Sequence, residues 1–160
     1  MAIAYFVLAE SEGAALIAEG QRALLSEFRA EDAAGKVFDS NDYDGQVMLL
    51  NFWATWCEPC KTEIPWLNEI NRRHDGRGVA VVGVARDVDG WNSVTPFLNA
   101  YDVNYKIVVP QSDLREKIAG LSILPTTIIV DRQGRIALIV RGMGSRILFT
   151  KAIDQLIRQR

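Results

Sequence analysis

The chain has 160 residues, of which 49% are hydrophobic and 24% are charged, and its formal net charge is −2. This length suits one domain with one core, and the apolar fraction is sufficient for folding without disulfide staples. The near-neutral charge, with acidic and basic residues interspersed, argues against a nucleic-acid partner. No polybasic or strongly amphipathic membrane-surface segment is present in the sequence.

The hydrophobic pattern predicts an α/β chain in which strands and helices alternate through the middle. Strands are expected at residues 28–31, 37–38, 47–53, 79–85, 107–109, 126–130 and 135–140. Helices are expected at residues 58–73, 91–101, 113–119 and 147–157. The continuous apolar runs at 47–50 and 79–85 are typical of buried strands. The last helix is amphipathic and is expected to pack on the sheet.

The first 26 residues are predicted to be an extension that packs on the domain formed by residues 27–160. Residues 2–9 are apolar and suit an edge strand, whereas residues 14–25 have helix-forming composition interrupted by Gly20. The apolar start is too short for a membrane span, which needs about 20 residues. No Lys or Arg precedes it, unlike a secretory signal.

The two cysteines of the chain, Cys57 and Cys60, stand between the strand at 47–53 and the helix that follows. A Cys-x-x-Cys pair at such a junction predicts a dithiol redox site. The free amides and the dipole at a helix start favour negative charge, so a Cys57 thiolate is stabilised there. The thiolate is the nucleophile. Cys60 lies one turn further, is expected to be buried, and shares a helical face with Cys57.

A metal site is disfavoured, because structural zinc takes four ligands. Cys57, Cys60 and the single histidine, His74, supply three at most. A histidine at the end of a helix is usually a cap or a surface group. We therefore expect no metal.

Two separated segments of the chain resemble the thioredoxin superfamily. Residues 53–61, Trp-Ala-Thr-Trp-Cys-Glu-Pro-Cys-Lys, resemble its active-site segment, and Pro65 falls where those proteins kink the next helix. Residues 124–127, Leu-Pro-Thr-Thr, resemble its cis-proline loop. From Glu27 onward the chain is most similar to the bacterial TlpA/ResA-like branch of extracytoplasmic thiol–disulfide oxidoreductases.

This resemblance implies a thioredoxin fold, with a mixed central β-sheet flanked by helices. It also implies an N-terminal strand extension and a β-α insertion between the active-site helix and the cis-proline strand. Trp56, Glu58 and Pro59 are expected to shape the site beside the cysteines. Leu124 and Pro125 are expected to line the surface on which a partner pairs like a strand.

The resemblance further implies exchange of the Cys57–Cys60 dithiol and disulfide with protein partners, supplied by an upstream thiol electron donor. No cofactor beyond the redox-active disulfide is expected. Glu58 disfavours a thiolate at Cys57 and opposes the helix dipole, which favours a reductase of exported proteins over a strong oxidant. We expect a periplasmic or otherwise extracytoplasmic monomer whose signal or anchor is absent from this chain, with a cytoplasmic location left open.

A proton relay needs a titrating group, and Asn51 stands where simple thioredoxins carry a buried aspartate. Because an amide does not titrate, Asp87 and Glu63 are the candidates for this role. The simpler interpretation makes both of them ordinary surface acids, and it is favoured for Glu63.

Three other functions were considered on the same fold, and the copper-handling protein is the alternative that stays open. A copper-handling protein on the same fold would bind Cu(I) through both thiols, but no histidine is placed to complete such a site. A peroxidase is disfavoured because Thr55 stands two residues before Cys57, whereas the peroxiredoxin pattern requires three. A role in cytochrome c maturation is not assigned. The dedicated subgroup carries a Gly-Ala-Pro-Glu loop, whereas this chain has Ile-Leu-Pro-Thr at 123–126.

Overall fold

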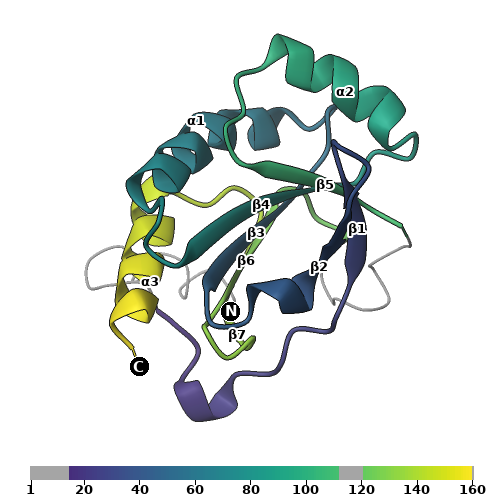
Figure 1. Ribbon diagram of the computed structural model, residues 1–160. Coiled ribbons are helices and arrows are strands. Elements are labelled where there is room, and N and C mark those ends of the chain that lie inside the picture. The colour runs from purple at the N-terminus through teal and green to yellow at the C-terminus, as the bar shows by residue number, and fades with distance from the viewer. Residues whose placement is uncertain (1–14, 112–120, 160) are drawn as a thin grey trace.

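A computed structural model describes residues 15–111 and 121–159. Within these ranges, one mixed sheet of seven strands carries helices against it (Figure 1). The strands are β1 (Arg29–Asp32), β2 (Val37–Asp39), β3 (Val47–Trp53), β4 (Val79–Ala85), β5 (Lys106–Pro110), β6 (Thr126–Val130) and β7 (Ile136–Arg141). The helices are α1 (Glu58–Arg73), α2 (Trp91–Ala100) and α3 (Arg146–Arg158), with short 3-10 helices η1 (Glu19–Gln21) and η2 (Ser40–Tyr43).

The thioredoxin fold expected from the sequence is confirmed. The seven strands and the three α-helices occur in the predicted order, and each end lies within one residue of its prediction. The predicted strand at 2–9 and the predicted helix at 113–119 lie outside the described residues. The inserted unit between α1 and the cis-proline strand includes α2 and β5.

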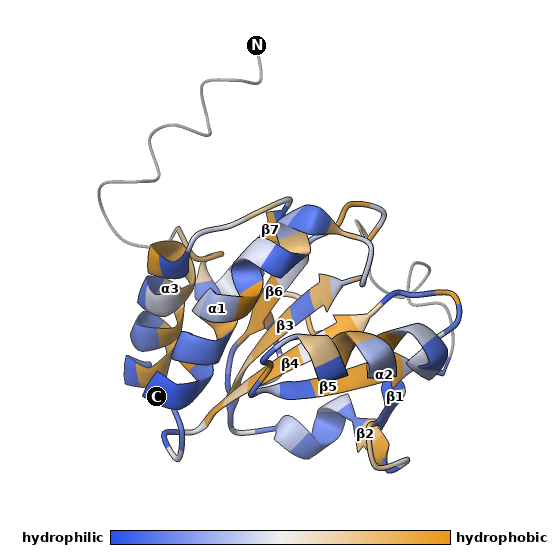
Figure 2. Cartoon of the chain, turned by 90° about the horizontal axis from the view of Figure 1, so that it is seen from above, coloured by the Kyte–Doolittle hydropathy of each residue, from blue (hydrophilic) through white to orange (hydrophobic). Residues whose placement is uncertain are grey.

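Strand β3 is the centre of the sheet, whose order is β2-β1-β5-β4-β3-β6-β7. It pairs with β4 in parallel and with β6 in antiparallel register. All seven of its residues are buried, and six of them are apolar, as expected for an interior strand; Asn51 is the one polar residue. In Figure 2 the central strands are mostly hydrophobic, whereas α1, α2 and α3 carry both hydrophobic and hydrophilic residues.

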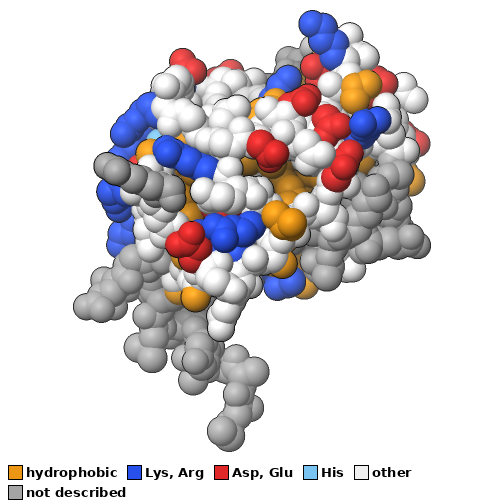
Figure 3. Space-filling model, turned by 60° about the horizontal axis from the view of Figure 1, so that its bottom comes forward, with side chains coloured by type: hydrophobic (Ala, Val, Ile, Leu, Met, Phe, Trp, Pro, Cys, Tyr) orange, Lys and Arg blue, Asp and Glu red, His pale blue; other side chains and the backbone are white. Residues whose placement is uncertain are grey.

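Two hydrophobic clusters lie on the two sides of the sheet. One joins the sheet to the helices, through residues such as Leu67 of α1, Phe97 of α2 and Phe149 of α3. The other contains Phe28, Phe38 and residues of the opposite sheet face. Acidic and basic side chains are intermixed on the face shown in Figure 3, with a small hydrophobic area among them. No helix in the described ranges is long and apolar enough to cross a bilayer.

The segment before β1 does not form the α-helix that its composition favours. It runs beside β7, where Ile17 N donates to Ala137 O (2.8 Å) and Leu25 N donates to Gly134 O (2.9 Å). Leu24 and Arg135 form an isolated antiparallel bridge. Only η1 is helical here, because these backbone groups pair with the edge of the sheet, and tertiary pairing outweighs a weak local propensity.

Candidate active site

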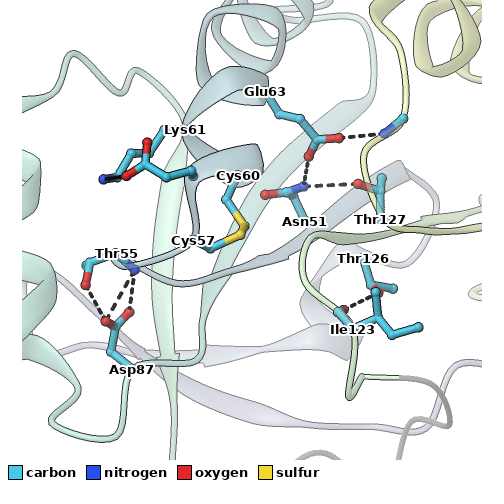
Figure 4. The surroundings of a disulfide bond; sticks show 12 residues. Asn51, Thr55, Cys57, Cys60, Lys61, Glu63, Asp87, Ile123, Thr126 and Thr127 are labelled. Carbon is cyan, nitrogen blue, oxygen red and sulfur yellow. Dashed lines mark hydrogen bonds and ion pairs between the residues drawn. A yellow bond between two sulfur atoms is a disulfide. The ribbon is translucent and has the colours of Figure 1, made fainter.

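The two cysteines lie where β3 gives way to α1. Cys57 is the N-cap residue of α1, and Pro59 lies in its first turn, a position where proline costs no helical hydrogen bond. The helical spacing brings the Cα atoms of Cys57 and Cys60 to 5.3 Å, and their sulfurs form a disulfide (Figure 4). The structure therefore joins the pair that the sequence singles out.

Both cysteines are enclosed in the disulfide form. Cys57 is 5% exposed and Cys60 is 2% exposed. The expected burial of Cys60 is thus present, whereas Cys57 is less exposed than its role as the attacking residue suggests. The reason is packing, since both side chains belong to the hydrophobic cluster that α1 forms with the sheet.

Exposed side chains surround the cysteines on α1 and on the loop before it. Trp56 is 67% exposed, and Glu58 and Pro59 are also exposed. The Glu58 carboxylate accepts a hydrogen bond from Lys61 Nζ at 2.6 Å, and this bond is the main cause that raises the pKa of Lys61. Lys61 therefore partly offsets the negative charge that Glu58 places beside Cys57.

The loop that carries Pro125 lies next to the cysteines. Phe52 of β3 pairs with Thr126 of β6, which places Pro125 beside the end of β3. The Leu124–Pro125 peptide bond is cis, the isomer expected from the sequence. Pro125 is buried and Leu124 is half-buried, whereas Ile123 is 51% exposed. The Thr126 hydroxyl donates to the carbonyl oxygen of Ile123 at 2.6 Å and closes this turn.

Glu63 is fully buried, so the interpretation of this residue as a surface acid is wrong. Its Oε2 accepts a hydrogen bond from Asn51 Nδ2 at 2.8 Å, and its Oε1 accepts one from Gly144 N at 2.9 Å. Asn51 Nδ2 also donates to Thr127 Oγ1 at 3.0 Å. Burial raises the pKa of Glu63, and the bonds from Gly144 and Asn51 oppose that rise. A buried carboxyl group with a perturbed pKa thus stands one helical turn after Cys60.

Asp87 is directed at the backbone that precedes Cys57. The Asp87 carboxylate accepts hydrogen bonds from Thr55 N, at 3.1 Å to Oδ2, and from the Thr55 hydroxyl. Figure 4 shows Asp87 and Glu63 on opposite sides of the disulfide. Asp87 therefore links the segment after β4 to the loop before Cys57, whereas Glu63 links α1 to Asn51 of β3 and to Gly144 before α3.

Comparison with known proteins identifies the family. Residues 20–139 match the AhpC/TSA family. The chain belongs to that family. The thiol-disulfide oxidoreductase ResA of Bacillus subtilis (strain 168) is 33% identical over 126 residues, which cover 79% of this chain and 69% of the relative. ResA of Bacillus thuringiensis subsp. konkukian is 31% identical over 116 residues, which cover 72% of this chain.

These relatives confirm the ResA-like branch of the thioredoxin superfamily that the motifs predict. The chain spans 66% of the length of the Bacillus thuringiensis relative. The crystal structure of a DsbF homologue from Corynebacterium diphtheriae superposes with a TM-score of 0.79 at 29% identity, covering 92% of this chain and 95% of that one. The names of the relatives and the cysteine pair support a thiol–disulfide oxidoreductase.

This AhpC/TSA family member also has a loop that sequence reasoning missed, Gly142–Gly144 between β7 and α3. Gly142 N donates to the carbonyl oxygen of Pro125 at 2.8 Å, and Gly144 N donates to Glu63. Met143 between them is 52% exposed. The available signal was a hydrophobic residue between two glycines at a strand-to-helix junction.

The described residues contain no group of three or more His, Cys, Asp or Glu side chains arranged to hold a metal. His74 is buried at the C-cap of α1, the opposite end of the helix from Cys57. Its Nδ1 donates to the carbonyl oxygen of Ile70 at 2.9 Å, and its Nε2 lies 3.0 Å from Asp154 Oδ1. The histidine is thus a cap, as its position in the sequence suggests, but it is not a surface group.

Proposed function

We propose that the protein exchanges the Cys57–Cys60 dithiol and disulfide with disulfides and dithiols of protein partners, and that it serves as a reductase of exported proteins. The observation that carries this proposal is the disulfide at the start of α1, beside the loop of Pro125. The names of the ResA relatives, thiol-disulfide oxidoreductases, support the same chemistry.

Reduction of a partner proceeds in two steps on the dithiol. The Cys57 thiolate attacks one sulfur of the partner disulfide, forms a mixed disulfide and releases the other partner sulfur as a thiolate. The Cys60 thiol then gives its proton to the Glu63 carboxylate and attacks the Cys57 sulfur. This restores the Cys57–Cys60 disulfide and releases the second partner thiolate, so the partner gains two electrons and the dithiol loses two.

Glu63 is assigned as the base for Cys60 because it is buried, lies one turn along the same helix, and has the raised pKa that such a role requires. An upstream thiol donor then reduces the Cys57–Cys60 disulfide by the same exchange. The branch to which the chain belongs favours an extracytoplasmic location, and we further propose that the protein is a monomer.

The catalytic assignment is tested with insulin as the disulfide probe and dithiothreitol as the donor. Cys57→Ser abolishes catalysis because the thiolate that attacks the partner disulfide is lost. Cys60→Ser accumulates a mixed disulfide through Cys57, detected by mass spectrometry, because the second step is lost. A Cys57→Ser protein as active as the wild type would refute the proposal.

The direction of electron flow is tested by the reduction potential of the pair, measured from Trp fluorescence in redox buffers. We expect about −250 mV or lower, near the value of thioredoxin. A potential near about −120 mV would make the protein an oxidant.

A further inference from the structure

The Gly142–Gly144 loop is attached to two parts of the active site. At one end, Gly142 N donates to the carbonyl oxygen of Pro125 at 2.8 Å. At the other end, Gly144 N donates to Glu63 Oε1 at 2.9 Å. Met143 therefore lies between a residue bonded to the proline of the partner-binding loop and a residue bonded to the buried carboxylate.

Glycine is required at positions 142 and 144 for different reasons. Gly142 has a φ of +86°, which an L side chain rarely adopts. A Cβ on Gly144 would stand 2.3 Å from Cζ of Phe149, a buried residue of α3. Gly142 thus suits the backbone conformation and Gly144 suits the close approach to Phe149, and Met143 is the exposed side chain of the loop.

Exposed hydrophobic side chains occur on three separate loops around the disulfide. Trp56 precedes Cys57, Ile123 lies in the proline loop, and Met143 lies in the loop before α3. An exposed apolar group of this kind is suited to a partner that buries it. The chemistry fits a polypeptide with an apolar residue beside its cysteine better than a small, charged disulfide.

We propose that Met143 contacts the apolar residue next to the reacting cysteine of the partner polypeptide, and that the charge of Glu63 holds Met143 in place through Gly144. This inference rests on the proposed function. It adds Met143 as a residue that determines specificity, and the position of Met143 depends on the charge of Glu63.

The coupling follows from the strength of the bond between Gly144 N and Glu63. A hydrogen bond to a charged acceptor is roughly twice as strong as one to a neutral acceptor. When Cys60 gives its proton to Glu63, the carboxylate becomes a neutral acid and the bond from Gly144 weakens. The loop then holds Met143 less firmly in the step that releases the partner. Glu63 afterwards returns the proton to solvent.

The neighbours of Glu63 leave its charge largely uncompensated. Asn51 of β3 and Thr127 of β6 are uncharged, and Glu63 has no ion-pair partner within residues 15–111 and 121–159. Tyr105, just before β5, is the titrating group that responds to it, since burial first and the charge of Glu63 second raise the pKa of that hydroxyl. The backbone N–H of Gly144 is therefore a main stabiliser of the charged form.

The test is a double-mutant cycle on the reduction of two disulfide peptides, one with leucine beside the cysteine and one with serine there. Met143→Ala should raise KM for the leucine peptide about fivefold, within the usual range of coupling between neighbouring residues. It should leave KM for the serine peptide within about twofold. In the Glu63→Gln background, where the charge is absent, Met143→Ala should raise KM for the leucine peptide less than about twofold.

Ile123→Ala is the matched control, because Ile123 is similarly exposed but is bonded to Thr126 and not to Glu63. It should raise KM by the same factor in both backgrounds. Equal effects of Met143→Ala in the two backgrounds, or on the two peptides, would overturn the inference while leaving the proposed function intact. A wild-type protein that reduces neither peptide would instead refute the proposed function.

A second measurement does not depend on catalysis. In the reduced wild-type protein, the NMR amide signal of Gly144 should shift as the Glu63 carboxyl titrates, whereas that of Gly142 should shift much less. A Gly144 signal that stays constant through the titration of Glu63 would show that the bond does not respond to the charge.

Discussion

The side-chain amide of Asn51 donates to the carboxylate of Glu63 at 2.8 Å, and both residues are at most 1% exposed. The pair joins the central strand to the active-site helix. It places a group that does not titrate at the position of a relay aspartate, and a titrating group on the neighbouring helix. In the proposed mechanism, the proton-accepting group is therefore on α1 and not on β3.

The free energy of unfolding should depend on pH through the titration of Glu63. Burial raises the pKa of Glu63 above its ordinary value of 4.5, so the folded protein binds this proton more tightly than the unfolded chain does. Its stabilising contribution is complete below the unfolded pKa and is lost as pH rises through the folded pKa. Glu63→Gln does not titrate, so it should gain stability relative to the wild type as pH rises from about 4 to 8, by about 1.4 kcal/mol per unit of pKa shift.

Urea unfolding at a series of pH values measures this difference. Glu69→Gln removes a negative charge from an exposed position of the same helix and serves as the control. A stability difference between Glu63→Gln and the wild type that does not change with pH would contradict the prediction.

Asp87 should act as a clamp on the cysteine loop and not as a relay. Its carboxylate accepts from both the backbone N–H and the hydroxyl of Thr55. Asp87→Asn removes the carboxylate charge but keeps one acceptor for Thr55, so it should leave the pH dependence of Cys57 alkylation unchanged if Asp87 only holds the loop. Asp87→Ala should destabilise the protein by about 1–3 kcal/mol, because the N–H of Thr55 loses its partner.

Alkylation of the reduced protein by iodoacetamide across pH, together with urea unfolding, checks both effects. Thr55→Ala is the matched variant, since it removes only the hydroxyl contact with Asp87. If Asp87→Asn displaced the pH profile of alkylation, the relay role expected from the sequence would be restored.

The sequence pattern was sufficient to predict the strand and the helix that hold the two cysteines. The apolar residues of β3 indicate the strand, and the helical spacing of Ile64, Leu67 and Ile70 indicates α1. Cys57 and Cys60 lie at the start of that helix. These signals are local, because each depends on neighbours within a few residues. The strands, the helices and the position of the cysteine pair could therefore be predicted from the pattern, whereas the thioredoxin fold was predicted from the resemblance.

The surroundings of Glu63 could not be read from local patterns. Charged residues are rarely buried without partners, so a surface position was the reasonable expectation. Its partners are Asn51, 12 residues away, and Gly144, 81 residues away. The spacing does hold one clue, since Glu63 follows Cys60 by three residues and so shares its buried helical face.

The N-terminal segment should depend on an ion pair that composition did not reveal. Arg22 NH1 lies 3.0 Å from Asp131 Oδ2, and both side chains are less than 5% exposed. Burial alone would raise the pKa of Asp131, but hydrogen bonds from Arg135, Arg22 and Gln133 outweigh it and lower the pKa. The stabilising effect of Asp131 is thus present at neutral pH and is lost as pH falls through the folded pKa.

Asp131→Asn should therefore destabilise the protein by about 3–5 kcal/mol at pH 7, because it leaves the buried Arg22 without its counter-charge. Glu69→Gln breaks the pair with Arg146, in which both side chains are about half exposed, and should cost less than about 1 kcal/mol. Urea unfolding at pH 7 compares the two variants. Equal losses would mean that the buried pair contributes no more than a surface one, and that the backbone bonds to β7 alone hold the segment.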